Sequence, residues 1–352
     1  MIRLKIIGLL LLFGLLSSCG IRVKYDEADK KCRNAPDVVL KKFDGGVFSI
    51  EIPESWKVIT AGNCETFSFC AYDSIKPANR VFLLGEIGPV YQHIEKKRED
   101  FQSIQDMGLD IGYFDMPVVL PFTPECYFEN LYLMFETEWA KAMKPICPDF
   151  HNTIIINSET ITPVMSDGIS KVLRAIHSSN DTIYQTLILL NLAPFYEEMG
   201  KTKKGLGKAY IVLGVNAEFN DFEALLPLML QIAASFHMNE NYIQNCSVGA
   251  SAFAMEQMKL SKSLTPYVTI MRDDWNARDK SMKYIILKSC DSLLNKIRIF
   301  DPNTGTPYLV SASFFDKYIN SKEEFEMNKL KILSVSDTAL WLKTPLDSSY
   351  IR

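Results

Sequence analysis

The amino-acid sequence predicts a mixed α/β (α+β) fold in which an antiparallel sheet packs against flanking helices. Three observations lead to this class: Pro53 stops an alternating strand-like run, four further strand-like runs follow in mid-chain, and a capped amphipathic helix comes after them. Hydrophobic residues make up 47% and aromatic residues 11% of the 352 residues. A chain of this length and composition is expected to fold around a large core, in two domains.

The predicted strands lie on both sides of a central helical region. Residues 47–52 (VFSIEI) alternate as a half-buried strand does, and the runs ETFSFCAY and NRVFLLGEI are interpreted as further strands. The four mid-chain runs are TIIINSETITPV, SKVLRAIHSS, TIYQTLILLNLA and GKAYIVLGVNA. The last two are apolar enough for the middle of a sheet.

Two helices are expected between these groups of strands, at about residues 90–106 and 124–144. If the second is one continuous helix, Cys126 and Cys147 lie about 30 Å apart along it. A disulfide needs Cα atoms within about 7 Å, so these two cysteines are not expected to pair.

The clearest helix signal lies in NDFEALLPLMLQIAASFHMN. Asn220 is expected at the cap position with Glu223 three residues later, which is a capping-box pattern. Pro227 either kinks this helix or moves its start to a later residue. Beyond about residue 240, residues 242–290 have a helical pattern, and NKIRIFDPNTGTPYLV predicts a hairpin with its turn in DPNTG.

The order of these elements resembles the PsbP and DcrB-like group of proteins. The resemblance is carried by a strand with FSIEIPESW, a mid-chain meander, and a late strand that leads into a helix ending in SF. It covers about residues 40–240 and implies a small α/β/α sandwich on one antiparallel sheet. Most of that group are non-enzymatic binding or assembly proteins, so the resemblance implies no catalytic residues and no cofactor.

The N-terminal segment predicts export. Arg3 and Lys5 precede an apolar run over residues 6–16. As a helix this run would be roughly 16 Å long, against the roughly 30 Å hydrocarbon core of a bilayer, so it is interpreted as a signal-peptide region. An ordinary secretory signal with a chance cysteine and an uncleaved anchor remain the alternatives.

The end of the apolar run resembles a bacterial lipobox: Leu16, Ser17, Ser18 and Cys19. The resemblance implies that the Cys19 thiol receives diacylglycerol, that cleavage follows Ser18, and that the new amino group is acylated, for example with palmitate. Two or three acyl chains, at about 0.8 kcal/mol per buried methylene, would anchor the chain stably to a membrane. Since Gly20 replaces the Asp of the inner-membrane retention signal, an outer membrane is favoured where one exists.

These signals predict a domain organisation. A signal peptide (residues 1–18) and a polar tether (19–37) come first, followed by the sandwich (38–240) and a smaller C-terminal α/β part (241–352). Cleavage leaves 36 basic against 42 acidic residues, a charge of −6, with no basic block, which argues against nucleic-acid binding.

Lipidation of Cys19 leaves seven other cysteines. An export compartment permits disulfides, and because seven is odd at least one thiol stays free unless it pairs between chains. The sequence leaves the pairing open for these residues: Cys32, Cys64, Cys70, Cys126, Cys147, Cys246 and Cys290.

No local motif predicts catalytic, cofactor or metal residues. The four histidines lack metal-ligand spacing, the cysteines lack C-x-x-C, and neither G-x-S-x-G nor S-x-x-K occurs. The run GKTKKGLGK departs from a phosphate loop and is interpreted as a flexible basic hairpin connection that could contact anionic lipid headgroups. The histidines are His93, His151, His177 and His237.

The segment MRDDWNARD carries a charge pair and an aromatic residue on a predicted helix. Asp274 and Arg278 are expected to pair on its surface, and Trp275 is expected either as a buried anchor or facing a groove between the two parts.

Together, these features predict an envelope lipoprotein that binds or scaffolds a protein partner in the periplasm or at the cell surface. The alternatives are an envelope hydrolase without a local motif and a lipoprotein that captures a solute or glycan.

Overall fold

The computed structural model describes most of the chain beyond its N-terminal segment. The described residues are 38–107, 114–163, 168–196, 202–248, 258–259, 262–276, 281–313, 330–334, 337 and 340–341. The chain divides into two units, Met1–Pro36 and Asp37–Arg352. The predicted signal peptide, Cys19 and the whole tether lie outside the described residues.

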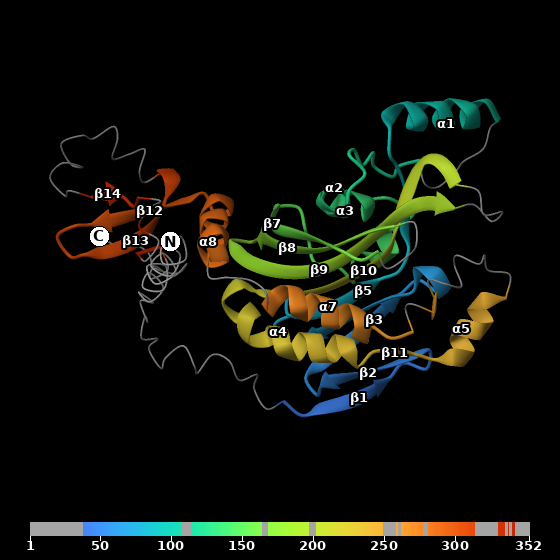
Figure 1. The fold of residues 1–352 in the computed structure, drawn as a ribbon, viewed down its shortest axis with the longest axis horizontal. Coiled ribbons are helices and arrows are strands. Elements are labelled where there is room, and N and C mark those ends of the chain that lie inside the picture. The colour runs from blue at the N-terminus through green and yellow to red at the C-terminus, as the bar shows by residue number, and fades with distance from the viewer. Residues whose placement is uncertain are drawn as a thin grey trace, which may run out of the picture. The chain divides into compact units, whose positions relative to one another are not determined.

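An eight-stranded antiparallel sheet forms the centre of the second unit (Figure 1). Its strands follow the order β3-β4-β5-β10-β9-β8-β7, and β6 also pairs with β10. The two most apolar runs, β9 and β10, occupy the middle of the sheet, as predicted. The strand bounds are β3 Trp56–Ala61, β4 Ser68–Asp73, β5 Arg80–Leu84, β6 Ile87–Tyr91, β7 Thr153–Ile161, β8 Ile169–Ser179, β9 Thr182–Tyr196 and β10 Thr202–Glu218.

The alternation of side chains along β10 creates two cores, one on each face of the sheet. Leu213 and Val215 point into the first core, whereas Val212 belongs to the second. The Phe82 ring fills the space beside Gly214. A Cβ atom at this position would lie 2.2 Å from the ring, so the position suits glycine. Both faces are therefore covered, which explains why residues 209–215 of this strand form an apolar run.

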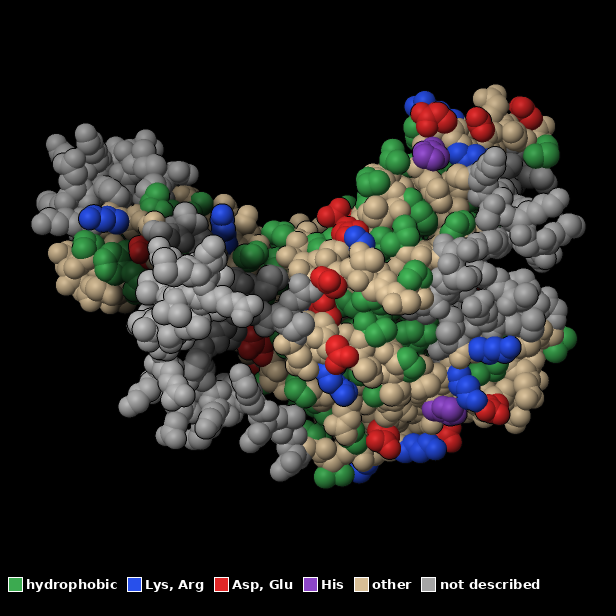
Figure 2. Space-filling model, viewed as in Figure 1, with side chains coloured by type: hydrophobic (Ala, Val, Ile, Leu, Met, Phe, Trp, Pro, Cys, Tyr) green, Lys and Arg blue, Asp and Glu red, His purple; other side chains and the backbone are tan. Residues whose placement is uncertain are grey.

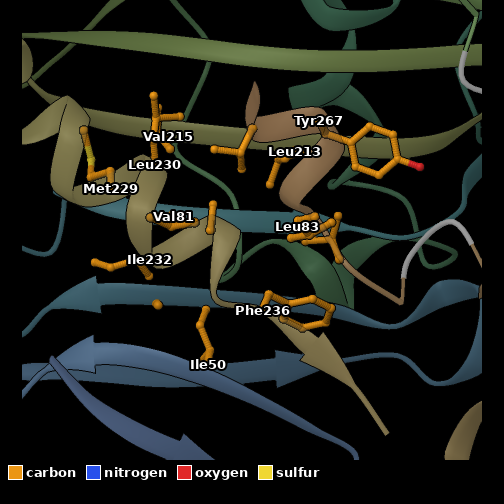
Figure 3. Close-up of a cluster of buried hydrophobic side chains, with 14 of the residues drawn as sticks. Ile50, Val81, Leu83, Leu213, Val215, Met229, Leu230, Ile232, Phe236 and Tyr267 are labelled. Atoms are coloured by element: carbon orange, nitrogen blue, oxygen red, sulfur yellow. The ribbon is translucent and has the colours of Figure 1, made fainter. Parts of the chain in front are cut away.

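Two helices and a small sheet cover the first face. These are α4 (Phe219–Ala234), α7 (Thr265–Asn276), and the strands β1 (Leu40–Asp44), β2 (Phe48–Pro53) and β11 (His237–Met238). Figure 3 shows Ile232 of α4, Tyr267 of α7 and Ile50 of β2 among the sheet residues Val81, Leu83, Leu213 and Val215. Phe48 of β2 stacks on Phe69 of β4 with ring centroids 5.7 Å apart, which joins the small sheet to the large one.

The predicted capping box of α4 is wrong. The helix begins at Phe219 directly after β10, its cap residue is Glu218, and no side chain caps it. Asn220 therefore lies inside the first turn. Pro227 lies within the helix, so it does not delay the start.

Short helices cover part of the second face, where one long helix was predicted over residues 124–144. The structure has α2 (Pro124–Glu129) and α3 (Leu131–Met134) instead. Asn130 separates them, and its side-chain amide donates to the carbonyl of Cys126 at 2.8 Å. The Thr137 hydroxyl similarly donates to the Met134 carbonyl at 2.6 Å. Such local side-chain bonds compete with helix propagation. Cys126 and Cys147 do not pair with each other, as expected, and both are free thiols.

The predicted helix at 90–106 is α1 (Ile94–Met107), and Tyr91 before it belongs to β6. The remaining elements are α5 (Glu240–Ser247), α8 (Ser281–Leu293), β12 (Lys296–Asp301), β13 (Thr306–Ser311) and β14 (Lys331–Ile332). The predicted hairpin is formed by β12 and β13, and the Gly305 amide donates to the Asp301 carbonyl at 2.8 Å in its turn.

The predicted domain boundary near residue 240 falls between α4 and α5. Both α5 and α7 pack on the first core, through Ile243 of α5 and Val268 and Met271 of α7. A disulfide between Cys64 and Cys246 ties α5 to the segment that leads into β4, with Cα atoms 5.4 Å apart.

Candidate binding groove between strand β7 and helix α7

Strand β7 lies at one end of the large sheet. Within the described part of the chain it pairs only with β8. The backbone groups on its outer side make no hydrogen bond to another described backbone group. A strand edge of this kind is able to pair with an additional strand.

Helix α7 is fixed beside this edge by a buried arginine of β8. The guanidinium of Arg174 lies 3.8 Å from the ring centroid of Trp275, and one of its nitrogens donates to the Trp275 carbonyl at 3.1 Å. Its Nε lies 3.8 Å from the Asp274 carboxylate. A cation at this position suits the last turn of a helix, where carbonyl groups have no partner within the helix.

A groove therefore runs between the outer strand and the helix. It has a volume of about 630 Å³ and is open to solvent. Ile161 of β7 and Ile270 of α7 are partly buried on the first core and form its apolar floor. The lining residues are Glu159, Thr160, Ile161, Thr162, Ile270, Asp273 and Asp274.

The lining of the groove is acidic. Among the described residues, its lining includes three carboxylates, those of Glu159, Asp273 and Asp274, and no lysine, arginine or histidine. Figure 2 shows acidic side chains in red near the middle of the view. The Asp274 side chain is only 5% exposed and faces Arg174, whereas Asp273 is exposed to solvent. The groove thus combines an apolar floor, acidic walls and a strand edge.

The groove brings together part of the segment that the sequence singled out. Trp275 is half-buried and packs on Phe222 with ring centroids 5.4 Å apart. Asp274 faces Arg174, and Arg278, its expected partner, lies outside the described residues. Sequence reasoning missed Arg174 and Glu159. The run VLRAI carried a signal, because an arginine inside an apolar strand needs a buried partner.

The histidines do not gather in the groove. His93, His151 and His237 are exposed, whereas His177 is 2% exposed in the sheet. The Asn216 Oδ1 atom lies 2.8 Å from His177 Nε2 and also accepts from the Thr186 hydroxyl. Since the Asn216 amide group donates to the Ala78 carbonyl, the Nε2 of His177 carries the proton. This histidine has a structural hydrogen bond rather than access to a substrate.

The basic run GKTKKGLGK differs from the predicted flexible connection. From Thr202 onward it belongs to β10, and Lys208 is buried. Its ammonium group pairs with Glu86 and lies 4.9 Å from the ring centroids of Phe195 and Tyr210. Lys208 is therefore not available to lipid headgroups.

A second exposed surface lies on the other face of the sheet, around α1 and α3. Trp139 is 52% exposed, and its indole donates to the Gly88 carbonyl. Figure 2 shows hydrophobic side chains in green in this region. The large exposed apolar residues of these segments are Ile94, Phe101, Met107, Leu120, Leu133 and Trp139.

Within the described residues, no three His, Cys, Asp or Glu side chains are grouped so that they could hold a metal ion. Likewise, none of the described helices has both the length and the apolar character that crossing a membrane requires.

Among known proteins, the matches to this chain are solved structures. No family model matches the chain, and no curated protein matches it. The solution structure of cyanobacterial PsbP (CyanoP) from Synechocystis sp. PCC 6803 is similar over 64% of this chain and 100% of that chain. The sequence identity is 14% and the TM-score is 0.27, so the likeness to PsbP is weak.

Proposed function

We propose that the chain is a lipid-anchored envelope protein that holds a protein partner in the groove between β7 and α7. The observation that carries the binding role is the coincidence of a strand edge with an acidic groove of about 630 Å³. The outer backbone groups of β7, which make no hydrogen bond to another described backbone group, would offer hydrogen bonds to a partner, and the carboxylates would select that partner by charge.

The proposed location rests on the N-terminal segment and agrees with the disulfide. The lipobox-like residues end at Cys19, and acylation there would anchor the mature chain. The disulfide between Cys64 and Cys246 supports an oxidising compartment, because such bonds persist outside the cytosol. The tether of residues 19–37 would then separate the folded unit from the membrane.

Replacement of the lipidated residue tests the anchor. In Cys19→Ala, the chain should no longer incorporate labelled palmitate and should leave the membrane fraction, because no thioether can form. Wild type and Cys126→Ser, which removes a different free thiol, should both remain labelled. Equal labelling of Cys19→Ala and wild type would rule out lipidation at this residue.

Charge reversal in the groove tests the binding role. Cross-linking and mass spectrometry on intact cells should identify a reproducible partner of the wild type. We expect Asp273→Lys to reduce its capture about tenfold, because a cation in an acidic groove repels a complementary partner. Asp273 is exposed, so this variant should fold.

Glu95→Lys serves as the matched control, because Glu95 is also exposed but lies on α1. The partner should be retained in this variant. Loss of the partner in Glu95→Lys, with retention in Asp273→Lys, would move the interface to the apolar surface around α1 and refute the groove.

A further inference from the structure

We infer that the partner enters the groove as an extended segment that adds a strand to β7, with Lys or Arg side chains at alternate positions. This inference rests on the proposed function and specifies the kind of partner. It depends on three features of the described residues: the direction of the β7 side chains, the position of α7, and the charge of the groove.

The side chains of β7 alternate between the two faces of the sheet. Glu159 is opposite Val172 and Ile161 is opposite Ser170 in the ladder with β8. Val172 belongs to the first core, the core on which α7 packs. Glu159 and Ile161 therefore point to the side of α7.

The residue between them points to the other face. Thr160 is opposite Lys171. The Lys171 ammonium donates to the Glu125 carboxylate of α2 at 2.6 Å. The α2 side of the edge thus carries an ion pair, and the described residues on the α7 side include the carboxylates of Glu159 and Asp273.

An added strand would have the same alternation. Four of its residues beside residues 159–162 would span about 13 Å. Every second side chain would face Glu159 of the strand and Asp273 of the helix, and the apolar part of a long basic side chain would cover Ile161 and Ile270. Lysine and arginine combine such an apolar stem with a cationic end, so they fit these positions. Opposite charges on neighbouring strands also favour pairing.

A folded surface would use the groove differently. It would contact the walls without needing the outward backbone groups of β7. Backbone hydrogen bonding therefore separates strand addition from docking of a folded domain.

Short synthetic peptides test this inference on the full mature chain in detergent. The probe is the fluorescein-labelled peptide Thr-Lys-Val-Lys-Val-Thr, acetylated and amidated, and the comparison peptide has Glu in place of both Lys. Fluorescence anisotropy should show at least about tenfold tighter binding of the Lys peptide, weakened by salt and by Asp273→Lys but not by Glu95→Lys.

Two N-methylated forms of the Lys peptide test the backbone contacts. Each form carries methyl groups on every second amide, in opposite phases. In an antiparallel or parallel pair only alternate amides face the neighbouring strand, so one form should bind about tenfold more weakly and the other should bind like the parent. Hydrogen exchange should slow in a peptide fragment containing residues 157–163 when the Lys peptide binds.

The outcomes separate this inference from the proposed function. Equal binding of the Lys and Glu peptides, no binding of either, or indifference to both methylation phases would overturn strand addition. If Asp273→Lys still loses its partner in cells, the groove remains the binding site for a folded surface. If Asp273→Lys keeps its partner in cells, the proposed function fails whatever the peptides do.

Discussion

Removal of the disulfide between Cys64 and Cys246 is expected to lower the free energy of unfolding by about 3 to 5 kcal/mol. The two cysteines are 182 residues apart in sequence, so the bond restricts a long loop in the unfolded chain. In the folded chain it holds α5 beside residues 64–66, where the Cys64 amide also donates to the Tyr242 hydroxyl at 2.7 Å. For the roughly 250 described residues, this loss corresponds to a thermal midpoint about 6 to 9 °C lower.

Thermal denaturation with and without dithiothreitol measures this effect. The double variant Cys64→Ser/Cys246→Ser should unfold at the lower temperature in both conditions. Cys126→Ser should behave as wild type does, because Cys126 is a free thiol. If reduction leaves the wild-type midpoint unchanged, these two residues do not form a stabilising bond.

Acidification is expected to destabilise the fold through His177. Burial in the sheet lowers the pKa of this imidazole to about 4, against the effect of its bond to Asn216 and of the nearby Asp149. The unfolded chain, with a histidine pKa near 6.5, binds a proton more readily than the folded chain between pH 6.5 and pH 4. Stability therefore falls as the pH falls through this window, by about 2 to 3 kcal/mol between pH 7 and pH 4.5.

A variant without an ionisable ring isolates this contribution from that of the carboxyl groups. His177→Gln keeps an N–H group that can donate to Asn216. Guanidinium denaturation at pH 7 and pH 4.5 should show a smaller acid loss for this variant than for wild type, by about 2 kcal/mol. His93→Gln removes an exposed histidine and should retain the full acid loss. Identical losses in His177→Gln and wild type would contradict the assignment of a neutral His177.

The strands were the part of the fold that the sequence predicted best. Apolar runs such as those of β9 and β10 indicate strands in the middle of a sheet, because both faces of such strands are buried. The helix over residues 124–144 was predicted as one element because its apolar pattern is continuous. Asn130 and Thr137 break it by bonding to backbone carbonyls, and such a bond has no periodic signature in sequence.

The groove could not be predicted because its parts are distant in sequence. Arg174 contacts Asp274 and Trp275, which follow it by about a hundred residues. The pattern MRDDWN placed acidic residues and a tryptophan on a predicted helix, but the strand edge opposite it became apparent only from the sheet order. The lipidation of Cys19 remains a prediction from the sequence.

The central claim is that a protein partner occupies the edge of β7, and a photo-reactive residue at that edge tests it most directly. Benzoylphenylalanine placed at Thr162, an exposed residue of the groove, should form a discrete adduct on irradiation of intact cells. The same residue at Ile75, which is 81% exposed in the turn after β4, should form none. An adduct that depends on Thr162 and disappears in Asp273→Lys would support the claim. No adduct at Thr162, or equal adducts at both positions, would contradict it.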